Sequence, residues 1–262
     1  MNVLITGACG GMGLAACELL TKCGYSVYGM DISEPEGSHA WQFLKVDLTK
    51  EEDVAGASEE LVRRGVSFDA LIHHAGIYDL NSLVEMSERD MKRIWDVNFF
   101  ALTRVNRLFL PLLAPGAKIV MTSSELAPLD PLPFTGIYGI TKTAVEKYAY
   151  SLRMEVQLLG FKVVVLRPGA VSTQLLNVST ERLDMFCRNT THYRYNAQRF
   201  NRIVSSVEAR SVSPERIAEL DLRILKSKNP KYVYSINRNP GLRLLNILPA
   251  HLQTAVIRGI LK

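Results

Sequence analysis

Cysteine is scarce in this chain of 262 residues, and its four thiols form no CxxC pair. A disulfide-stapled miniprotein is therefore excluded, and reduced thiols in a cytoplasmic protein are the simplest interpretation. No apolar run approaches the roughly 18 residues that a membrane-spanning helix needs, and we expect no secretory signal, because no basic segment precedes an apolar one at the start. The hydrophobic residues, 47% of the chain, can fill a substantial core, which excludes a disordered protein.

Positive charge is concentrated in the last third of the sequence. Residues 181–262 hold 15 Lys and Arg against 6 Asp and Glu, whereas the whole chain has 31 against 26. These basic residues are scattered and form no block of five or more. We therefore interpret them as a solvated surface beside an anion-friendly cleft and expect no nucleic-acid partner.

Short β-branched runs alternate with longer helical patterns along the first 170 residues. The expected strands are Val3–Thr6, Ser26–Met30, Ala70–His73, Lys118–Thr122, Val163–Arg167 and, later, Lys231–Ser235. The expected helices are Leu14–Lys22, Glu51–Arg64, Glu88–Leu113, Tyr138–Leu159, Pro214–Lys226 and Ile247–Leu261. This alternation predicts an α/β protein with a Rossmann-like, doubly wound parallel sheet of about seven strands and helices on both faces. No linker divides the chain, so residues 1–262 are expected to form a single dinucleotide-binding and catalytic domain, with a substrate lid at about 172–213.

A glycine-rich loop, Thr6–Gly13, follows the first expected strand and opens the first helix. Glycines let a backbone turn sharply and approach a pyrophosphate, and the helix supplies free N–H groups at its start. Asp31 ends the second strand, 24 residues after Gly7, close to the spacing at which a carboxylate binds the adenosine ribose. Neither the loop nor Ile32-Ser33 offers a basic residue for the extra phosphate of NADP, so the sequence favours NAD.

Tyr138 and Lys142 are four residues apart, which places them on one face of the expected helix. An ammonium beside a phenol lowers its pKa and makes tyrosine usable as a general acid and base. Ser124 follows the strand Lys118–Thr122, at the sheet edge where such folds bind ligands. Asn98 lies in an apolar helical stretch, where it serves either a buried structural hydrogen bond or a proton path.

In these motifs the sequence resembles the short-chain dehydrogenase/reductase family, in the subgroup with a TGxxxGxG loop and a YxxxK active site; the resemblance also covers Asp47, Ala75-Gly76 and Pro168-Gly169. It implies that Tyr138 is the acid/base, that Ser124 binds the substrate oxygen and that Lys142 binds the nicotinamide ribose. Asn98 then holds a water of the proton relay. The cofactor-binding residues that this resemblance and the glycine loop indicate are Gly7, Cys9, Gly10, Gly11, Met12, Gly13, Asp31, Asp47, Leu48, His74, Ala75, Gly76, Tyr138, Lys142, Pro168, Gly169, Val171 and Thr173.

The chain departs from the family pattern at two places. His73-His74 replaces the usual Asn-Asn pair, and we expect imidazole to take over part of the hydrogen bonding that braces the sheet. Adjacent residues of a strand face opposite sides, so the two histidines are not expected to bind a metal together, and no metal site is predicted. Ser124 precedes Tyr138 by 14 residues, one more than usual, which leaves Ser123 as the alternative serine.

Apolar residues follow the motifs and indicate a bulky hydrophobic substrate. The C-terminal run from Pro230 to Leu261 resembles the tail of the family's hydroxysteroid and retinol dehydrogenases, which implies a hydroxysteroid, and Arg182, Arg188 and Arg194 could receive the carboxylate of a bile acid. The expected substrate-binding residues are Ser124, Leu126, Phe134, Tyr138, Gln174 and Leu175. The reaction expected from the resemblance is NAD(H)-dependent interconversion of a secondary alcohol and a ketone, by a homodimer or homotetramer. The alternatives are an NADPH-dependent 3-oxoacyl thioester reductase and a non-catalytic dinucleotide-binding protein.

The expected last helix, Ile247–Leu261, combines apolar residues with Arg258. Such a helix can lie on a membrane surface. Packing in the core or at a subunit interface explains the same pattern, and this is what we expect.

Overall fold

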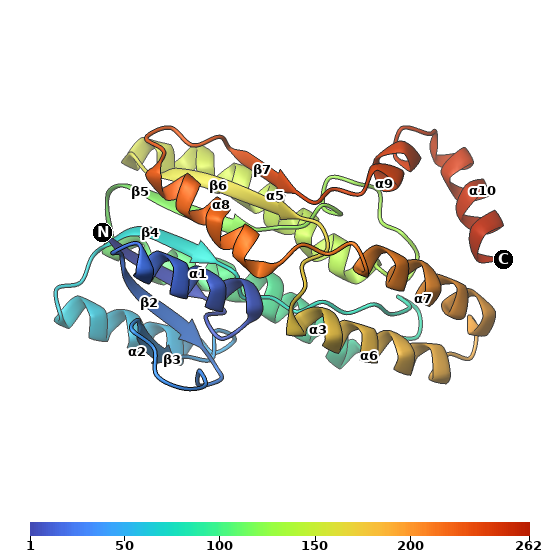
Figure 1. Cartoon of the computed structure of the whole chain (residues 1–262), viewed down its shortest axis with the longest axis horizontal. Helices are drawn as coiled ribbons and strands as arrows, with labels where there is room; N and C mark the ends of the chain where they lie inside the picture. Colours follow the sequence, from blue (N-terminus) through green and yellow to red (C-terminus); the bar gives the residue numbers. More distant parts are fainter.

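Seven parallel strands form one sheet in the computed structural model, in the order β3-β2-β1-β4-β5-β6-β7 (Figure 1). The strands are β1 (Asn2–Thr6), β2 (Ser26–Asp31), β3 (Gln42–Lys45), β4 (Phe68–His73), β5 (Leu113–Thr122), β6 (Lys162–Pro168) and β7 (Val233–Ile236). The chain order reverses between β1 and β4, and ligands of open α/β sheets bind at such a point. The predicted Rossmann-like, doubly wound sheet is confirmed.

The structure describes residues 1–173, 180–207 and 209–262 together with their side chains. Among the helices searched over these residues, none combines the length and the apolarity that crossing a membrane requires.

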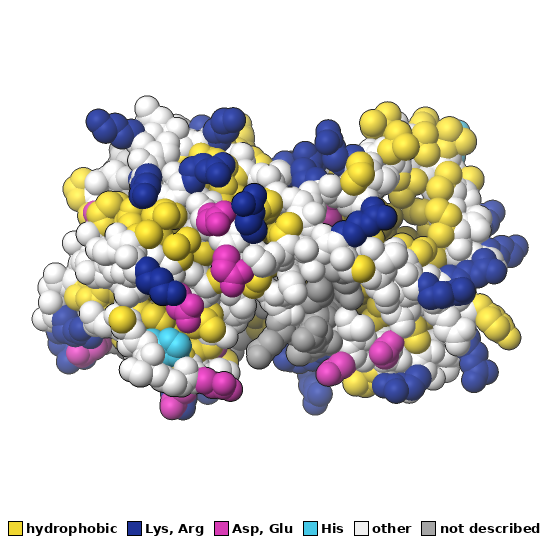
Figure 2. Space-filling model, viewed as in Figure 1, with side chains coloured by type: hydrophobic (Ala, Val, Ile, Leu, Met, Phe, Trp, Pro, Cys, Tyr) yellow, Lys and Arg dark blue, Asp and Glu magenta, His cyan; other side chains and the backbone are white. Residues whose placement is uncertain are grey.

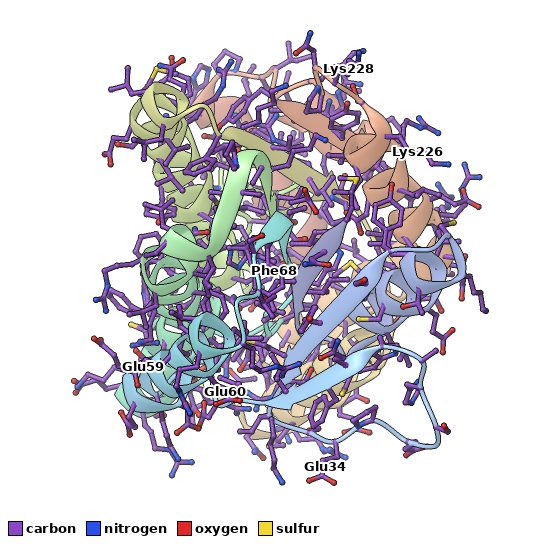
Figure 3. All side chains as sticks on the ribbon, turned by 90° about the vertical axis from the view of Figure 1, so that its left-hand side faces the viewer. Glu34, Glu59, Glu60, Phe68, Lys226 and Lys228 are labelled. Atoms are coloured by element: carbon purple, nitrogen blue, oxygen red, sulfur yellow. The ribbon has the colours of Figure 1, made fainter. Side chains whose placement is uncertain are left out.

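The two faces of the sheet carry separate hydrophobic layers. Leu4 and Phe68 lie in the layer covered by α2 (Glu51–Arg63), α4 (Ala101–Phe109) and α5 (Gly136–Val156). Val3 and Ile5, the neighbours of Leu4, lie in the layer covered by α1 (Gly11–Lys22) and α8 (Pro214–Lys226). This alternation is what the pleat of a strand buried on both faces requires. Figure 3 shows Phe68 in the interior and Glu59, Lys226 and Lys228 at the periphery.

The expected helix Glu88–Leu113 is interrupted. It divides into α3 (Glu88–Trp95), a π-helical turn (Asp96–Phe100), α4 and a 3₁₀ turn (Leu110–Leu112), and β5 begins already at Leu113. A π-turn of this kind often occurs at functional sites, and this one carries Asn98.

The segment expected to form a lid contains two helices, α6 (Gln174–Asn189) and α7 (Arg194–Glu208). They lie beyond the carboxyl ends of the strands in Figure 1. The predicted terminal helix, Ile247–Leu261, is present as α10 (Ala250–Leu261) and begins three residues later than expected; a separate short helix, α9 (Pro240–Leu245), precedes it, and Pro249 lies in the break between the two. Proline lacks the N–H that a continuous helix needs, which explains the break.

Candidate active site

Three glycines between the end of β1 and the first turn of α1 leave no room for a Cβ atom. Gly7 has a φ of +72°, and a Cβ there would lie 2.7 Å from the Ala75 nitrogen. A Cβ on Gly13 would lie 2.0 Å from the Gly7 oxygen, and one on Gly11 would lie 2.6 Å from Cγ2 of Thr173. The loop therefore approaches Ala75 and Thr173 closely and leaves the first N–H groups of α1 available for a phosphate. This cradle fits a dinucleotide.

Asp31 stands at the end of β2, beside this loop. One carboxylate oxygen accepts a hydrogen bond from the Cys9 nitrogen at 3.0 Å, and the other accepts one from the Ser33 nitrogen at 3.0 Å. The carboxylate therefore fixes the loop while it stays half-buried at the sheet edge. A negative charge held there repels a further phosphate on the ribose.

Tyr138, Ser124 and Lys142 come together at the carboxyl edge of the sheet. The Ser124 hydroxyl lies within hydrogen-bonding reach of the Tyr138 hydroxyl. The Lys142 ammonium donates to the Thr122 carbonyl at 3.1 Å and lies 5.7 Å from the centre of the Tyr138 ring. The Tyr78 ring packs edge-on against Tyr138, with 4.5 Å between the ring centres. These contacts hold the phenol of Tyr138 in one orientation.

Burial has the largest effect on the pKa values of Tyr138 and Lys142. It raises the pKa of Tyr138 to about 12, because the phenolate loses water, although the hydrogen bond from Ser124 acts in the opposite direction. Burial also lowers the pKa of Lys142 to about 8. The structure therefore differs from the expectation that the ammonium lowers the pKa of Tyr138, since loss of water and the charge of Glu125 raise this pKa and only Ser124 lowers it.

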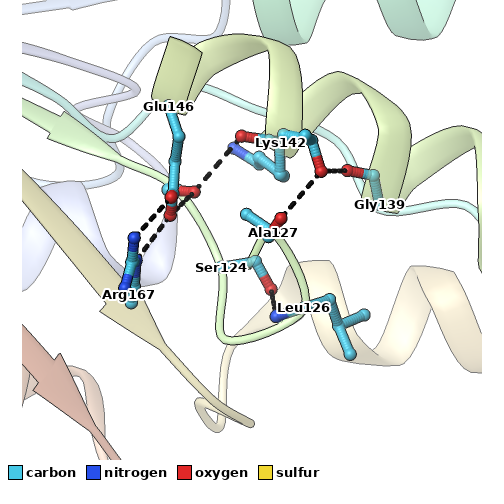
Figure 4. A network of polar contacts seen from close by, with 9 residues as sticks. Ser124, Leu126, Ala127, Gly139, Lys142, Glu146 and Arg167 are labelled. Carbon is cyan, nitrogen blue, oxygen red and sulfur yellow. Dashed lines mark hydrogen bonds and ion pairs between the residues drawn. The ribbon is translucent and has the colours of Figure 1, made fainter. Parts of the chain in front are cut away.

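A polar network connects the serine loop to α5 and β6 (Figure 4). Glu146 accepts two hydrogen bonds of 2.6 Å from the Arg167 guanidinium and one of 2.9 Å from the Ser123 hydroxyl. The Thr143 hydroxyl contacts the carbonyls of Ala127 and Gly139 at 2.8 and 2.9 Å. Ser123 is thus engaged in the scaffold, and Ser124 is the serine that contacts Tyr138.

Asn98 is almost fully buried in the π-turn. Its amide oxygen accepts from the Ile77 nitrogen at 2.7 Å, and its amide nitrogen donates to the Ile77 carbonyl at 2.9 Å and the Thr141 hydroxyl at 3.2 Å. A Cβ on Gly76 would lie 3.3 Å from the Asn98 oxygen and 3.4 Å from the Lys142 ammonium. Gly76 therefore keeps open the space between these two polar groups.

His73 and His74 point to opposite sides of β4. His73 hydrogen-bonds Asn106 of α4 at 2.9 Å, and burial lowers its pKa to about 4. His74 hydrogen-bonds the Thr122 hydroxyl of β5 at 2.9 Å and Asp221 of α8 at 2.8 Å, with no side-chain exposure on His74 or Asp221. The imidazoles thus brace the sheet against a helix on each face.

An apolar cleft of about 170 Å³ opens beside Tyr138. Several predicted residues line it, namely Met12, His74, Gly76, Ser124, Leu126, Tyr138, Lys142, Pro168, Gly169, Val171 and Thr173. Its wall also contains residues that the motifs did not indicate, mainly from α7 and α9: Ile77, Tyr78, Glu125, Phe200, Ile203, Val204, Val207 and Leu242. The apolar spacing of Phe200, Ile203 and Val207 was the available sequence signal.

One predicted substrate-binding residue lies elsewhere. Phe134, expected in the substrate wall, packs instead against the rings of Phe186, Tyr193 and Phe200 at 5.0 to 5.4 Å, in a separate cluster behind the cleft. Phe134 has a positive φ of 63°, two residues before α5 begins. Gln174 and Leu175 lie outside the described residues.

The remaining predicted cofactor residues follow the sheet edge away from this cleft. The Asp47 carboxylate accepts hydrogen bonds from the nitrogen and hydroxyl of Thr49 at 3.0 and 2.6 Å. The Leu48 carbonyl accepts one from Arg104 at 2.6 Å. Gly7, Cys9, Gly10, Gly11 and Gly13 form the glycine loop, and Ala75 packs on Gly7. This row of residues continues the cradle beyond β1 toward β2 and β3.

Glu125 is the unexpected charged residue of the cleft. It is 6% exposed, and its carboxylate accepts a 2.6 Å hydrogen bond from the Asn239 nitrogen, just before α9. Burial raises the pKa of Glu125, and its negative charge adds to the rise in the pKa of Tyr138. Glu125 therefore links the catalytic loop to the C-terminal segment and adjusts the acidity of Tyr138.

Comparison with known proteins agrees with this geometry. The family model for short chain dehydrogenases matches residues 1–184. The chain is 27% identical over 232 residues to the 3-ketodihydrosphingosine reductase of Bacteroides thetaiotaomicron, covering 88% of this chain and 85% of that protein. It is 30% identical over 190 residues to estradiol 17-beta-dehydrogenase 2 of Mus musculus, covering 66% of this chain and about half, 49%, of the mouse protein. A short chain dehydrogenase family protein from Francisella tularensis superimposes with a TM-score of 0.75 at 26% identity, over 90% of this chain and 96% of that one.

Proposed function

The chain belongs to the short chain dehydrogenase family, and we propose that it interconverts a secondary alcohol and a ketone on a bulky hydrophobic substrate with NAD(H). The observation that carries this proposal is the Tyr138 hydroxyl, held by Ser124 beside Lys142 at the end of an apolar cleft. A nicotinamide dinucleotide in the glycine cradle supplies the hydride.

Each polar residue of the cleft has a separate task. Tyr138 gives its proton to the carbonyl oxygen during reduction and takes it back during oxidation. Ser124 donates a hydrogen bond to the same oxygen and so stabilises the charge that develops there. Lys142 places a positive charge beside the phenol, and Asn98 anchors the end of the space through which a proton reaches Lys142.

Reduction is the direction that the acidity of Tyr138 supports. With its pKa raised to about 12, Tyr138 carries a proton at neutral pH and can donate it. Oxidation requires the phenolate and is therefore expected to accelerate as the pH rises.

NAD(H) is proposed over NADP(H) because of the charge beside the glycine loop. Asp31 is held by two backbone nitrogens, and the residues after it are Ile32, Ser33 and the acidic Glu34. A 2′-phosphate would meet the negative charge of Asp31, and the basic residue opposite it on β3, Lys45, is paired with Glu34 at 2.9 Å. Steady-state rates with each reduced cofactor test this preference, and a higher kcat/KM with NADPH would contradict it.

The substrate class follows from the wall of the cleft. Apolar side chains line this wall, namely Leu126, Leu132, Val204, Val207 and Leu242. Burial of such surface contributes about 25 cal/mol per Å² to the free energy of binding. The names of the relatives include a steroid and a long-chain ketone, which supports a lipophilic ketone here. Activity confined to small polar polyols, in a panel that also contains hydroxysteroids, bile acids and long-chain ketones, would contradict this proposal.

Tyr138→Phe tests the assignment of the acid/base. Loss of the hydroxyl is expected to lower kcat at least 100-fold, because general acid–base catalysis contributes about 10² to 10⁴. Binding of NADH, followed by fluorescence titration, should change little, since the ring remains. Tyr150→Phe, at an exposed position of the same helix, is the matched control. A Tyr138→Phe protein with full turnover would exclude this mechanism. If the native protein binds the cofactor but turns over none of the substrates in the panel, it is not an enzyme of this class.

A further inference from the structure

The outer face of α10 is apolar and uncovered. The helix packs inward through Gln253, Ile257 and Leu261, which recur every four residues. A second row with the same spacing, Leu252, Val256 and Ile260, points outward and is 43%, 40% and 52% exposed. Of the expected packing in the core or at a subunit interface, packing in the core therefore accounts for only one of the two apolar rows.

The uncovered row continues onto the preceding helix and turn. Leu244 in α9 is 67% exposed and Ile247 is 77% exposed. Figure 2 shows hydrophobic side chains gathered over α9 and α10, with Lys and Arg around them. We call Leu244, Ile247, Leu252, Val256 and Ile260 the tail surface.

The C-terminal segment that forms the tail surface carries charge of one sign, and one acidic residue from elsewhere, Asp130 of the loop between β5 and α5, contacts it through Asn246 and Gln253. Asp221 is the last acidic residue of the sequence, and eight Lys and Arg follow it. Three of these, Arg243, Arg258 and Lys262, are exposed on or next to α9 and α10. Arg199 and Arg202 of α7, the helix on which α10 packs, are exposed as well.

We propose that the tail surface binds an anionic lipid bilayer, with the apolar row in the interface and the basic residues on the headgroups. A helix with one apolar side and basic flanks is the usual element of such binding. A symmetric contact with a second copy is less suitable, because it would place Arg243, Arg258 and Lys262 near their own counterparts without acidic partners in this segment.

The tail surface lies next to the cleft. Leu242, two residues before the exposed Leu244, lines the cleft beside Tyr138. α7 also connects the cleft with the tail surface, since it lines the cleft through Val204 and packs against α10. A lipophilic substrate dissolved in the bilayer would therefore enter from the surface on which the protein rests. The bilayer contact itself does not depend on which ketone is reduced.

Co-sedimentation of the full chain with vesicles tests the proposal. Vesicles of phosphatidylglycerol and phosphatidylcholine should sediment the protein, whereas pure phosphatidylcholine should sediment little of it. Binding to the mixed vesicles should fall steeply with added salt, because the Debye length shortens. No sedimentation with the mixed vesicles at low salt overturns the proposal.

Two variants separate the apolar and basic contributions. The triple change Leu252→Ser, Val256→Ser and Ile260→Ser is expected to weaken vesicle binding more than tenfold. Arg258→Glu with Lys262→Glu should weaken it at least fivefold for each residue changed. Leu158→Ser, at an 84% exposed position far from the tail surface in sequence, is the matched control and should bind as the native protein does.

Light scattering on the same proteins identifies the competing occupant. If the tail surface binds lipid, the triple variant and the native protein should have the same molar mass in solution. A triple variant that loses a dimer while it still sediments with anionic vesicles would assign the surface to a second copy and overturn the proposal. Ketone reduction in detergent-free buffer, equal to that of the native protein, shows that each variant is folded.

Discussion

At the scale of single residues, Glu125 has an effect on Tyr138 that can be measured separately from its structural contact. Its negative charge raises the pKa of Tyr138, in addition to the larger effect of burial. Glutamine at this position keeps an oxygen that can accept from the Asn239 nitrogen, so the loop should stay in place.

Glu125→Gln should therefore move the pH profile of alcohol oxidation to lower pH, by less than about one pH unit. The reason is that the neutral amide no longer opposes formation of the phenolate. Initial rates of oxidation between pH 7 and pH 11 give the midpoint, and Glu155→Gln, at an exposed position of α5, is the control. A midpoint that stays or rises would contradict the assigned interaction.

His73 makes stability depend on pH in a defined range. Its pKa is lowered from 6.5 to about 4 in the folded state, so the unfolded chain binds the proton more strongly between these values. The contribution of neutral His73 is complete above pH 6.5 and is lost as the pH falls toward 4, by up to about 3 kcal/mol. Urea unfolding across this range should show a weaker pH dependence in His73→Asn than in the native protein. The exposed His192→Asn should retain the native dependence, and equal slopes for all three proteins would mean that His73 is not the group that titrates.

At the scale of elements, the glycine loop and the first helix form one tightly packed unit. A methyl group on Gly13 would lie 2.0 Å from the Gly7 oxygen, so Gly13→Ala must displace the loop. We expect at least tenfold weaker NADH binding and a loss of about 1–3 kcal/mol in the free energy of unfolding. Calorimetric titration measures the binding and urea unfolding measures the stability, and unchanged binding in Gly13→Ala would show that the loop tolerates the methyl group.

In α2, by contrast, a Cβ on Gly56 meets nothing within 4 Å. Gly56→Ala should therefore stabilise the protein by up to about 1 kcal/mol, which urea unfolding measures.

Most of the sheet could be predicted because its strands are buried on both faces and form continuous apolar runs in the sequence. β3 was missed for the opposite reason. Gln42-Phe43-Leu44-Lys45 lies at the sheet edge, with only two apolar residues between exposed ends. The interruption at Asp96–Phe100 also escaped prediction, since the residues on either side are ordinary helix formers and the π-turn depends on how Asn98 is held by Ile77 and Thr141.

The inner part of the candidate site follows from local motifs, whereas its outer wall depends on distant segments. Tyr138 and Lys142 share one helix, so their spacing is sufficient. Glu125 enters the cleft through a contact with Asn239, 114 residues later, and no local pattern indicates it. The apolar face of α7 is visible in the sequence, but which surface it covers is decided by tertiary packing.

At the scale of the whole molecule, the α6–α7 segment is fastened to the body by two acidic residues of the β4–α3 connection. Glu85 accepts hydrogen bonds from the Thr190 hydroxyl, from the nitrogen and hydroxyl of Thr191, and from the His192 nitrogen, at 2.6 to 3.1 Å. Asp79 pairs with Arg182 at 2.5 Å. The outer wall of the cleft is thus held from the β4 side.

Glu85→Ala should loosen this segment, because four hydrogen bonds lose their acceptor. We expect faster proteolysis near residue 190 and a KM for the ketone that rises several-fold, while kcat changes little because Tyr138 is untouched. Glu88→Ala, an exposed position of α3, should leave both unchanged. Equal proteolysis of the two variants would mean that Glu85 does not hold the α6–α7 segment.

The buried pair of His74 and Asp221 has a consequence for how the protein is made. The two residues are 147 positions apart, and the pair joins the edge of the cofactor cradle to α8. A nascent chain that has left the ribosome only as far as α6 already carries the glycine loop, Ser124, Tyr138 and Lys142, yet its His74 still lacks the carboxylate. The cradle therefore obtains its brace to α8 only after most of the chain has been synthesised.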